Sequence, residues 1–219
     1  MRTYAVGDIH GRRDLLDALL ADIAGDAGSH PRRIVFLGDY IDRGPDSAGV
    51  IRTVRALEAE EPDRIVALKG NHEDLLARAR SSEEWRETWL FNGGDAALGS
   101  FGVGRVEDVP PDVLDWVAAR PTTVEDEWRC FVHAGLDPSR DRLDQSDEDR
   151  LWIRDRFLRA DHDFGKLVVH GHTPLRTGLP DLRRHRLNLD TAAVYGGRLT
   201  AAVFEDGRER PVGFLQRPA

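Results

Sequence analysis

The feature that most constrains this fold is a repeated pattern. An apolar run is followed by a short segment that contains glycine together with Asp, Asn or His. It occurs five times along the chain: Gly7-Asp8-Ile9-His10-Gly11, Gly38-Asp39-Tyr40-Ile41-Asp42-Arg43-Gly44, Gly70-Asn71-His72-Glu73, His133-Ala134-Gly135 and His170-Gly171-His172-Thr173. In an open α/β sheet, ligands bind outside the carboxyl ends of the strands. We therefore expect these five loops to converge in one crevice.

The first third of the chain alternates between strand and helix patterns. Apolar runs predict strands at Thr3–Val6, Ile34–Leu37 and Ile65–Leu68. Helical periodicity predicts helices at Asp14–Ala24, after Pro45, and at Glu73–Arg80. Such alternation favours parallel pairing in an α/β sheet.

The remainder divides into a helical and a strand-rich part. Ser81–Pro121 carries no strand signal, and its aromatic spacing and the helix predicted at Asp112–Ala119 indicate a helical insertion. Further strands are predicted at Thr122–Glu125, Trp128–Val132, Lys166–Val169, Arg186–Leu189, Leu199–Phe204 and Val212–Leu215. Short loops between several of them predict antiparallel or mixed pairing. A single domain over residues 1–219 accounts for this pattern most economically.

Composition narrows the class of function. A formal charge of −8 argues against a general nucleic-acid binder or an anionic-membrane binder, both of which favour a basic face. The one cysteine, Cys130, lies in an apolar run and indicates no disulfide. The first apolar run breaks after Val6, too early for a signal peptide, and no stretch has membrane-spanning length. These observations predict a cytoplasmic protein.

The side chains at the five strand ends form a metal-ligand set. They offer hard carboxylate and amide oxygens together with imidazole, and no thiolate, which suits Mn²⁺, Fe or Zn²⁺ better than a calcium cage. Each motif alone has a simpler reading, because Asp8 and His10 fit a capped turn and His133 fits a packed core residue. His170 fits either a strand residue or a ligand. The five motifs together favour a metal site.

The same motifs resemble those of the PPP-type metallophosphoesterases, the calcineurin-like phosphatases. GDIHG, GDYIDRG and GNHE stand in that family's order, followed by the histidines of FVHAGL and HGHT. The chain is more closely similar to the small bacterial and phage-lambda-type protein phosphatases. That likeness rests on WLFNGG (Trp89–Gly94), LWIRDRF (Leu151–Phe157), HGHTP (His170–Pro174) and LDTAAVYGGRLT (Leu189–Thr200). Ala192 departs from it, since glycine is expected there.

The resemblance implies the fold and the ligand set. The family fold is a four-layer sandwich, in which two mixed β-sheets are flanked by helices. Asp8 and His10 would bind the first of two divalent ions, Asp39 would bridge both, and Asn71, His133 and His172 would hold the second. Mn²⁺ is the expected metal, with Fe or Zn²⁺ as alternatives.

The resemblance also implies the activity. Arg43 and Arg154 would grip the substrate phosphate, and the planar guanidinium suits bidentate contact with its oxygens. His72, oriented by Asp42, would be the general acid. The expected reaction is hydrolysis of phosphoserine or phosphothreonine in a protein, by direct attack of a metal-bridging hydroxide. The alternative is a dinucleoside-polyphosphate hydrolase, which shares these motifs. A phosphodiesterase or nuclease is less favoured, because the Asp-Arg-Gly of GDYIDRG resembles the phosphatase branch of the superfamily. A regulatory module that has lost catalysis is also less favoured, because every motif position is filled.

Overall fold

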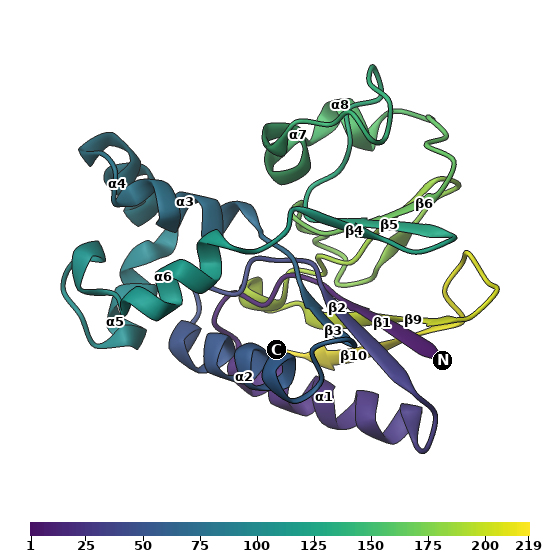
Figure 1. Ribbon diagram of the computed structural model, residues 1–219, viewed down its shortest axis with the longest axis horizontal. Coiled ribbons are helices and arrows are strands. Elements are labelled where there is room, and N and C mark those ends of the chain that lie inside the picture. The colour runs from purple at the N-terminus through teal and green to yellow at the C-terminus, as the bar shows by residue number, and fades with distance from the viewer.

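The computed structural model describes residues 1–219 and is built in four layers (Figure 1). Helices α1 (Arg13–Ala27) and α2 (Ser47–Glu60) cover the outer face of one five-stranded sheet. A second five-stranded sheet lies on the inner face of the first. Beyond the second sheet lie two short helices, α7 (Asp147–Trp152) and α8 (Asp155–Leu158). The predicted α/β sandwich is confirmed.

Both sheets are mixed. The first has the order β10-β9-β1-β2-β3, in which β1, β2 and β3 are parallel and β9 runs antiparallel to both of its neighbours, β1 and β10. Its strands are β1 (Arg2–Val6), β2 (Arg32–Phe36), β3 (Ile65–Ala67), β9 (Arg198–Glu205) and β10 (Gly213–Pro218). The second has the order β4-β5-β6-β8-β7, with β5, β6 and β8 parallel. Its strands are β4 (Thr123–Glu125), β5 (Arg129–Val132), β6 (Leu167–His170), β7 (Asp181–Leu182) and β8 (Arg186–Asn188).

The central strands are apolar on both faces because each face is covered. In β1, Tyr4 and Val6 join the core that includes the buried faces of α1 and α2, while Ala5 joins the core between the two sheets. Successive strand residues point to opposite faces, so a strand between two layers must be apolar throughout. A third core packs Cys130 of β5 against Phe157 of α8.

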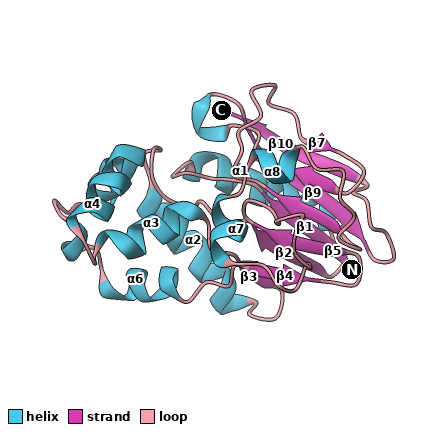
Figure 2. Cartoon of the chain, turned by 90° about the horizontal axis from the view of Figure 1, so that it is seen from above, coloured by secondary structure: helices cyan, strands magenta, loops and turns pink.

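The segment predicted as a helical insertion contains helices and no strand. It lies beside the sandwich, with α3 (Asn71–Ala79) leading into it (Figure 2). Its elements are α4 (Glu83–Trp89), a π-helical turn at Leu90–Gly94, α5 (Asp95–Phe101), a 3-10 turn at Val106–Asp108 and α6 (Pro111–Ala118). None of the helices in the chain is long and apolar enough to cross a membrane.

Three helical features differ from the sequence-based expectation. Helix α3 begins at Asn71, two residues earlier than predicted, because the Glu73 side chain accepts a hydrogen bond from the backbone N–H of Gly70. Helices α7 and α8 lie between two predicted strands, in a stretch where no element was predicted. The signal for α7 was present, since Ser146 caps a first turn rich in acidic residues. Helix α8 has only four residues, too few for helical periodicity to show.

Candidate active site

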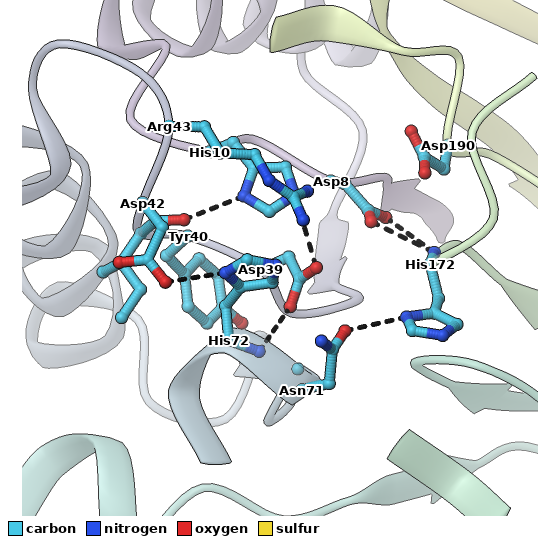
Figure 3. Close-up of polar contacts among 12 residues, drawn as sticks. Asp8, His10, Asp39, Tyr40, Asp42, Arg43, Asn71, His72, His172 and Asp190 are labelled. Atoms are coloured by element: carbon cyan, nitrogen blue, oxygen red, sulfur yellow. Dashed lines mark hydrogen bonds and ion pairs between the residues drawn. The ribbon is translucent and has the colours of Figure 1, made fainter. Parts of the chain in front are cut away.

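The predicted site residues converge at the carboxyl ends of the strands (Figure 3). Eight of them are buried, with at most 4% of each residue exposed: Asp8, His10, Asp39, Asp42, Asn71, His72, His133 and His172. They follow β1, β2, β3, β5 and β6, so loops from both sheets meet at one place. Arg43 is half-buried, and Arg154 is exposed.

A first cluster of possible metal ligands joins His10, Asp39 and His72. The Nδ1 of His10 lies 2.8 Å from the carbonyl oxygen of Ile41, so Nδ1 carries the proton and donates it. The lone pair of His10 Nε2 therefore points into the site, 3.4 Å from Asp39 Oδ2. Arg43 Nη1 donates to the same nitrogen at 2.8 Å.

A second cluster joins Asp39, His133 and His172. His133 Nδ1 donates to the carbonyl oxygen of Leu37 at 2.9 Å, which directs the Nε2 lone pair into the site. That nitrogen lies 2.9 Å from Asn71 Oδ1 and 3.4 Å from Asp39 Oδ1. His172 Nδ1 lies 2.7 Å from the same Asn71 oxygen. The two oxygens of Asp39 thus face the two clusters.

This donor set fits two divalent cations. Burial lowers the pKa of His10 to about 3 and also lowers the pKa values of His133 and His172, so these imidazoles are neutral at neutral pH. At His133, Nε2 and the oxygens of Asn71 and Asp39 then face one another as acceptors with no proton between them. Acceptors gathered in a buried site are stabilised by a cation. Hard oxygen and imidazole donors suit Mn²⁺, Fe or Zn²⁺.

Asp8 lies beside these clusters and belongs to neither. Its carboxylate accepts hydrogen bonds from the backbone N–H of His172, at 3.0 and 3.2 Å. Burial and the charge of Asp190 raise the pKa of Asp8 well above its usual range. Asp190, which the sequence did not indicate, is buried next to Asp8 and His172 (Figure 3), and burial raises its pKa to about 7. The carboxylates of Asp8 and Asp190 bring further negative charge into the buried site, and a bound cation would neutralise it.

Two arginines stand at the mouth of the site. Arg154 Nε donates to His172 Nε2 at 3.0 Å, and the guanidinium of Arg43 lies over the ring of Tyr195, 5.6 Å from its centroid. Arg43 and Arg154 form no ion pair with a carboxylate. Both guanidinium groups can therefore receive an anion without first breaking a salt bridge.

His72 is held by a carboxylate that is itself held by the helical insertion. His72 Nδ1 lies 2.6 Å from Asp42 Oδ2, and the indole N–H of Trp89 donates to both oxygens of Asp42, at 3.0 and 3.1 Å. Burial alone would lower the pKa of His72, but the charge of Asp39 and the bond to Asp42 outweigh it and raise the pKa. Trp89 is fully buried in the core, and it also orients Asp42.

Residues 1–202 match the family of calcineurin-like phosphoesterases. The chain belongs to this family. It is 31% identical to serine/threonine-protein phosphatase 1 of Salmonella typhimurium, a match covering 91% of this chain and 90% of that relative. It is 35% identical to a symmetrical bis(5'-nucleosyl)-tetraphosphatase of Dechloromonas aromatica, over 63% of this chain but 45% of that longer relative.

Solved structures share the fold of this phosphoesterase. A candidate diadenosine tetraphosphatase superposes with a TM-score of 0.73 at 25% identity, covering 99% of this chain and 93% of that chain. A serine/threonine phosphatase from Saccharomyces cerevisiae superposes with a TM-score of 0.66 at 18% identity, covering 100% of this chain and 79% of that chain. The expected membership and the expected fold are both confirmed, and the chain is a metallophosphoesterase with two clusters that suit a binuclear metal centre.

Backbone strain in the phosphoesterase is concentrated at the site. Six residues other than glycine have positive φ, and five of them are predicted site residues: His10 (46°), Asp39 (54°), Asp42 (72°), Arg43 (67°) and His172 (65°). Such conformations cost about 1–3 kcal/mol each and persist only where the surroundings enforce them. The sixth is Ala192 (61°), at the position where the family resemblance predicts glycine.

Close approach of two loops explains two of the glycines in the motifs. Gly38 has a φ of 102°, and a Cβ added there would lie 2.5 Å from the backbone nitrogen of Gly70. A Cβ on Gly70 would in turn lie 2.2 Å from Asp39 Oδ1. Only glycine at these two positions brings Asp39 next to the start of α3.

Glu73 organises these loops, although it was not expected to have a role in the site. Its buried carboxylate accepts hydrogen bonds from the backbone N–H groups of Asp39 at 2.8 Å, Tyr40 at 2.9 Å and Gly70 at 2.9 Å. The glutamate of GNHE was visible in the sequence, but its acceptance of N–H groups from the loop after β2 was not. Glu73 therefore ties the loop after β2 to the loop after β3.

Replacement of Glu73 by alanine is expected to destabilise the metal-free protein by about 3 kcal/mol or more, because each buried N–H left unpaired costs about 1–3 kcal/mol. Thermal unfolding in chelator should show a fall in Tm of about 6–12 °C. Glu127, which is exposed and has no ion-pair partner, provides the matched control Glu127→Ala. An unchanged Tm in Glu73→Ala would contradict this role.

His170 is a strand residue and not a ligand in this arrangement. It ends β6, is fully buried, and packs edge-on against Phe157 at 5.0 Å between ring centroids. It belongs to neither cluster of candidate ligands. Of the two histidines in HGHT, only His172 faces the site.

Proposed function

We propose that this phosphoesterase is a metal-dependent protein phosphatase that hydrolyses phosphoserine and phosphothreonine monoesters. The observation that carries the proposal is the match to the Salmonella typhimurium phosphatase, which extends over about nine-tenths of both chains. The curated symmetrical tetraphosphatases match over less than half of their length. A dinucleoside-polyphosphate hydrolase is the second candidate, favoured by the likeness to a candidate diadenosine tetraphosphatase along nearly the whole chain.

The residues that would hold two Mn²⁺ ions follow from the two clusters. His10 and Asp39, with Asp8 beside them, would hold one ion, and Asn71, His133 and His172 would hold the other, with Asp39 shared. When bound, such a pair of ions supplies positive charge to the phosphate and lowers the pKa of a bound water.

Arg43 and Arg154 would bind and orient the phosphate. Their guanidinium groups lie against His10 and His172, one from each cluster, and neither is paired with a carboxylate. A planar guanidinium can donate two parallel hydrogen bonds to a phosphate. Placed on both sides of the site, the two arginines would hold the phosphorus in one orientation relative to the metal ligands.

His72 would supply the proton that the leaving serine or threonine oxygen needs. Its Nδ1 is bound to Asp42, which leaves Nε2 as the nitrogen free to donate. Asp42 raises the fraction of imidazolium and fixes the ring, and Trp89 fixes Asp42. An alkoxide is a poor leaving group, so its protonation lowers the barrier to cleavage.

Replacement of Arg154 by alanine is expected to raise KM for phosphopeptides and weaken inhibition by inorganic phosphate about tenfold, since hydrogen bonds to charged groups contribute about 1.5–3 kcal/mol and Arg154 is exposed. Metal content should be preserved, because Arg154 supplies no ligand. Steady-state kinetics with phosphate as inhibitor would measure both effects. An unchanged inhibition constant would make Arg154 an ordinary surface charge.

One comparison tests the proposed function directly. The Mn²⁺-loaded protein is given a phosphoserine peptide in one reaction and diadenosine tetraphosphate in another, and kcat/KM is measured for each. A protein phosphatase should favour the peptide, and chelation should abolish the activity. A strong preference for diadenosine tetraphosphate would replace the proposal with the second candidate.

A further inference from the structure

A recess of about 670 Å³ opens directly beside the metal-ligand clusters. It lies between the turn after β6, which contributes Thr173 and Arg176, and the turn before β9, which contributes Tyr195. The backbone N–H of Leu175 donates to the carbonyl oxygen of Asp190 at 2.8 Å and ties these two turns together. A recess of this volume is large enough for part of a substrate beyond the phosphate itself.

The recess is continuous with the proposed phosphate site. Arg154 lines it and also donates to His172 Nε2 at 3.0 Å. Tyr195 lines it as well, and its ring lies under the guanidinium of Arg43. A substrate whose phosphate is held by Arg43 and Arg154 would therefore place its neighbouring groups in or near this recess.

The recess is positively charged, whereas the chain as a whole is negative. Arg154 and Arg176 line it, and no acidic residue does, although the formal charge of the chain is −8. Arg176 is exposed and forms no ion pair. Two unpaired guanidinium groups in one recess attract an anionic group. Arg154 would be occupied by the phosphate being cleaved, which leaves Arg176 for a second anion.

We propose that this recess binds an acidic side chain of the phosphoprotein close to the phosphorylated residue, and that Arg176 determines this preference. The inference rests on the proposed protein phosphatase function. An extended peptide advances about 3.3–3.6 Å per residue, so an acidic residue close in sequence to the phosphoserine can reach the same recess. The shared chemistry is a second anion beside the scissile phosphate, and an acidic peptide or a polyphosphate chain could supply it.

The test uses the Mn²⁺-loaded protein and matched phosphoserine peptides that carry Glu or Gln at the flanking positions, on one side of the phosphoserine or the other. The value of kcat/KM should be about tenfold higher for Glu than for Gln on one side, as expected for a charge-assisted contact in a half-open site. Arg176→Gln should bring this ratio close to one, and Arg176→Lys should retain part of it. Arg52 is exposed on α2 and forms no ion pair, so Arg52→Gln should keep the full ratio. Added salt should reduce the ratio.

The outcomes separate this inference from the proposed function. Equal cleavage of the Glu and Gln peptides by the unaltered protein, or a preference that survives Arg176→Gln, would overturn the role of Arg176 while leaving a protein phosphatase. Cleavage of diadenosine tetraphosphate without cleavage of any phosphopeptide would overturn the proposed function itself. A fall in diadenosine tetraphosphate cleavage confined to Arg176→Gln, with phosphopeptides unaffected, would assign the recess to a polyphosphate chain and overturn the peptide assignment.

Discussion

Replacement of Asp39 by asparagine is expected to remove both metal ions together with the activity. The two carboxylate oxygens lie 3.4 Å from His10 Nε2 and 3.4 Å from His133 Nε2, so one side chain serves both clusters. Asparagine keeps the shape and tolerates the positive φ of this position, but it lacks the charge. Loss of a residue that only hydrogen-bonds to a metal ligand lowers the metal affinity about 10–100-fold. Loss of a ligand that both metal ions share should lower it more.

Elemental analysis after Mn²⁺ loading and removal of free metal would measure the occupancy directly. The unaltered protein should approach two ions per chain, as expected for a two-metal site. Asp115→Asn provides a control at an exposed aspartate of α6, and it should behave like the unaltered protein. Two ions retained by Asp39→Asn, or full activity of the unaltered protein after thorough chelation, would refute the binuclear centre.

Replacement of His72 by asparagine is expected to lower kcat on a phosphoserine peptide about 10²–10⁴-fold, the usual contribution of a positioned general acid. Two roles compete for this residue, because its ring lies in one cluster of candidate ligands while its Nδ1 is bound to Asp42. A p-nitrophenolate leaving group is stable as an anion and needs the proton less. The loss on p-nitrophenyl phosphate should therefore be much smaller than the loss on the peptide.

The decisive measurement for His72 is kcat on both substrates, with the metal content determined on the same preparation. His72→Asn should keep both ions, and the exposed control His30→Asn should change neither activity nor metal content. If the activity falls equally on both substrates, His72 is not the general acid, and if one ion is lost, His72 is a metal ligand.

The candidate ligands could be predicted because their signals are local in the sequence. Asp39 and Asn71 each follow a glycine directly after an apolar run, and strand order then brings such ends to one edge of a sheet. The contacts of Asp8, in contrast, could not be predicted in this way. Its carboxylate faces the backbone of His172, 164 residues away, and no local pattern specifies such a contact.

The supporting residues escaped prediction for the same reason. Trp89 reads as a packing residue, since its bond to Asp42 joins positions 47 residues apart through the fold of the helical insertion. Glu73 reads as a first-turn helix residue, and its contact with the loop after β2 spans 34 residues. Both contacts stabilise the folded protein because they are buried, since a polar group without a hydrogen bond costs free energy where water is excluded.

The sequence by itself determined the α/β class, the change from alternating strands and helices to a strand-rich part, and the chemical identity of the ligands, since periodicity and residue type are properties of short segments. Tertiary structure alone decided which atoms meet. The two sheets had to pack face to face before the oxygens of Asp39 could lie between His10 and His133. The same packing brought Arg154, Arg176 and Tyr195 to one recess from three separate segments. Contacts of this kind depend on how distant elements pack, because side chains meet only where buried surfaces fit together.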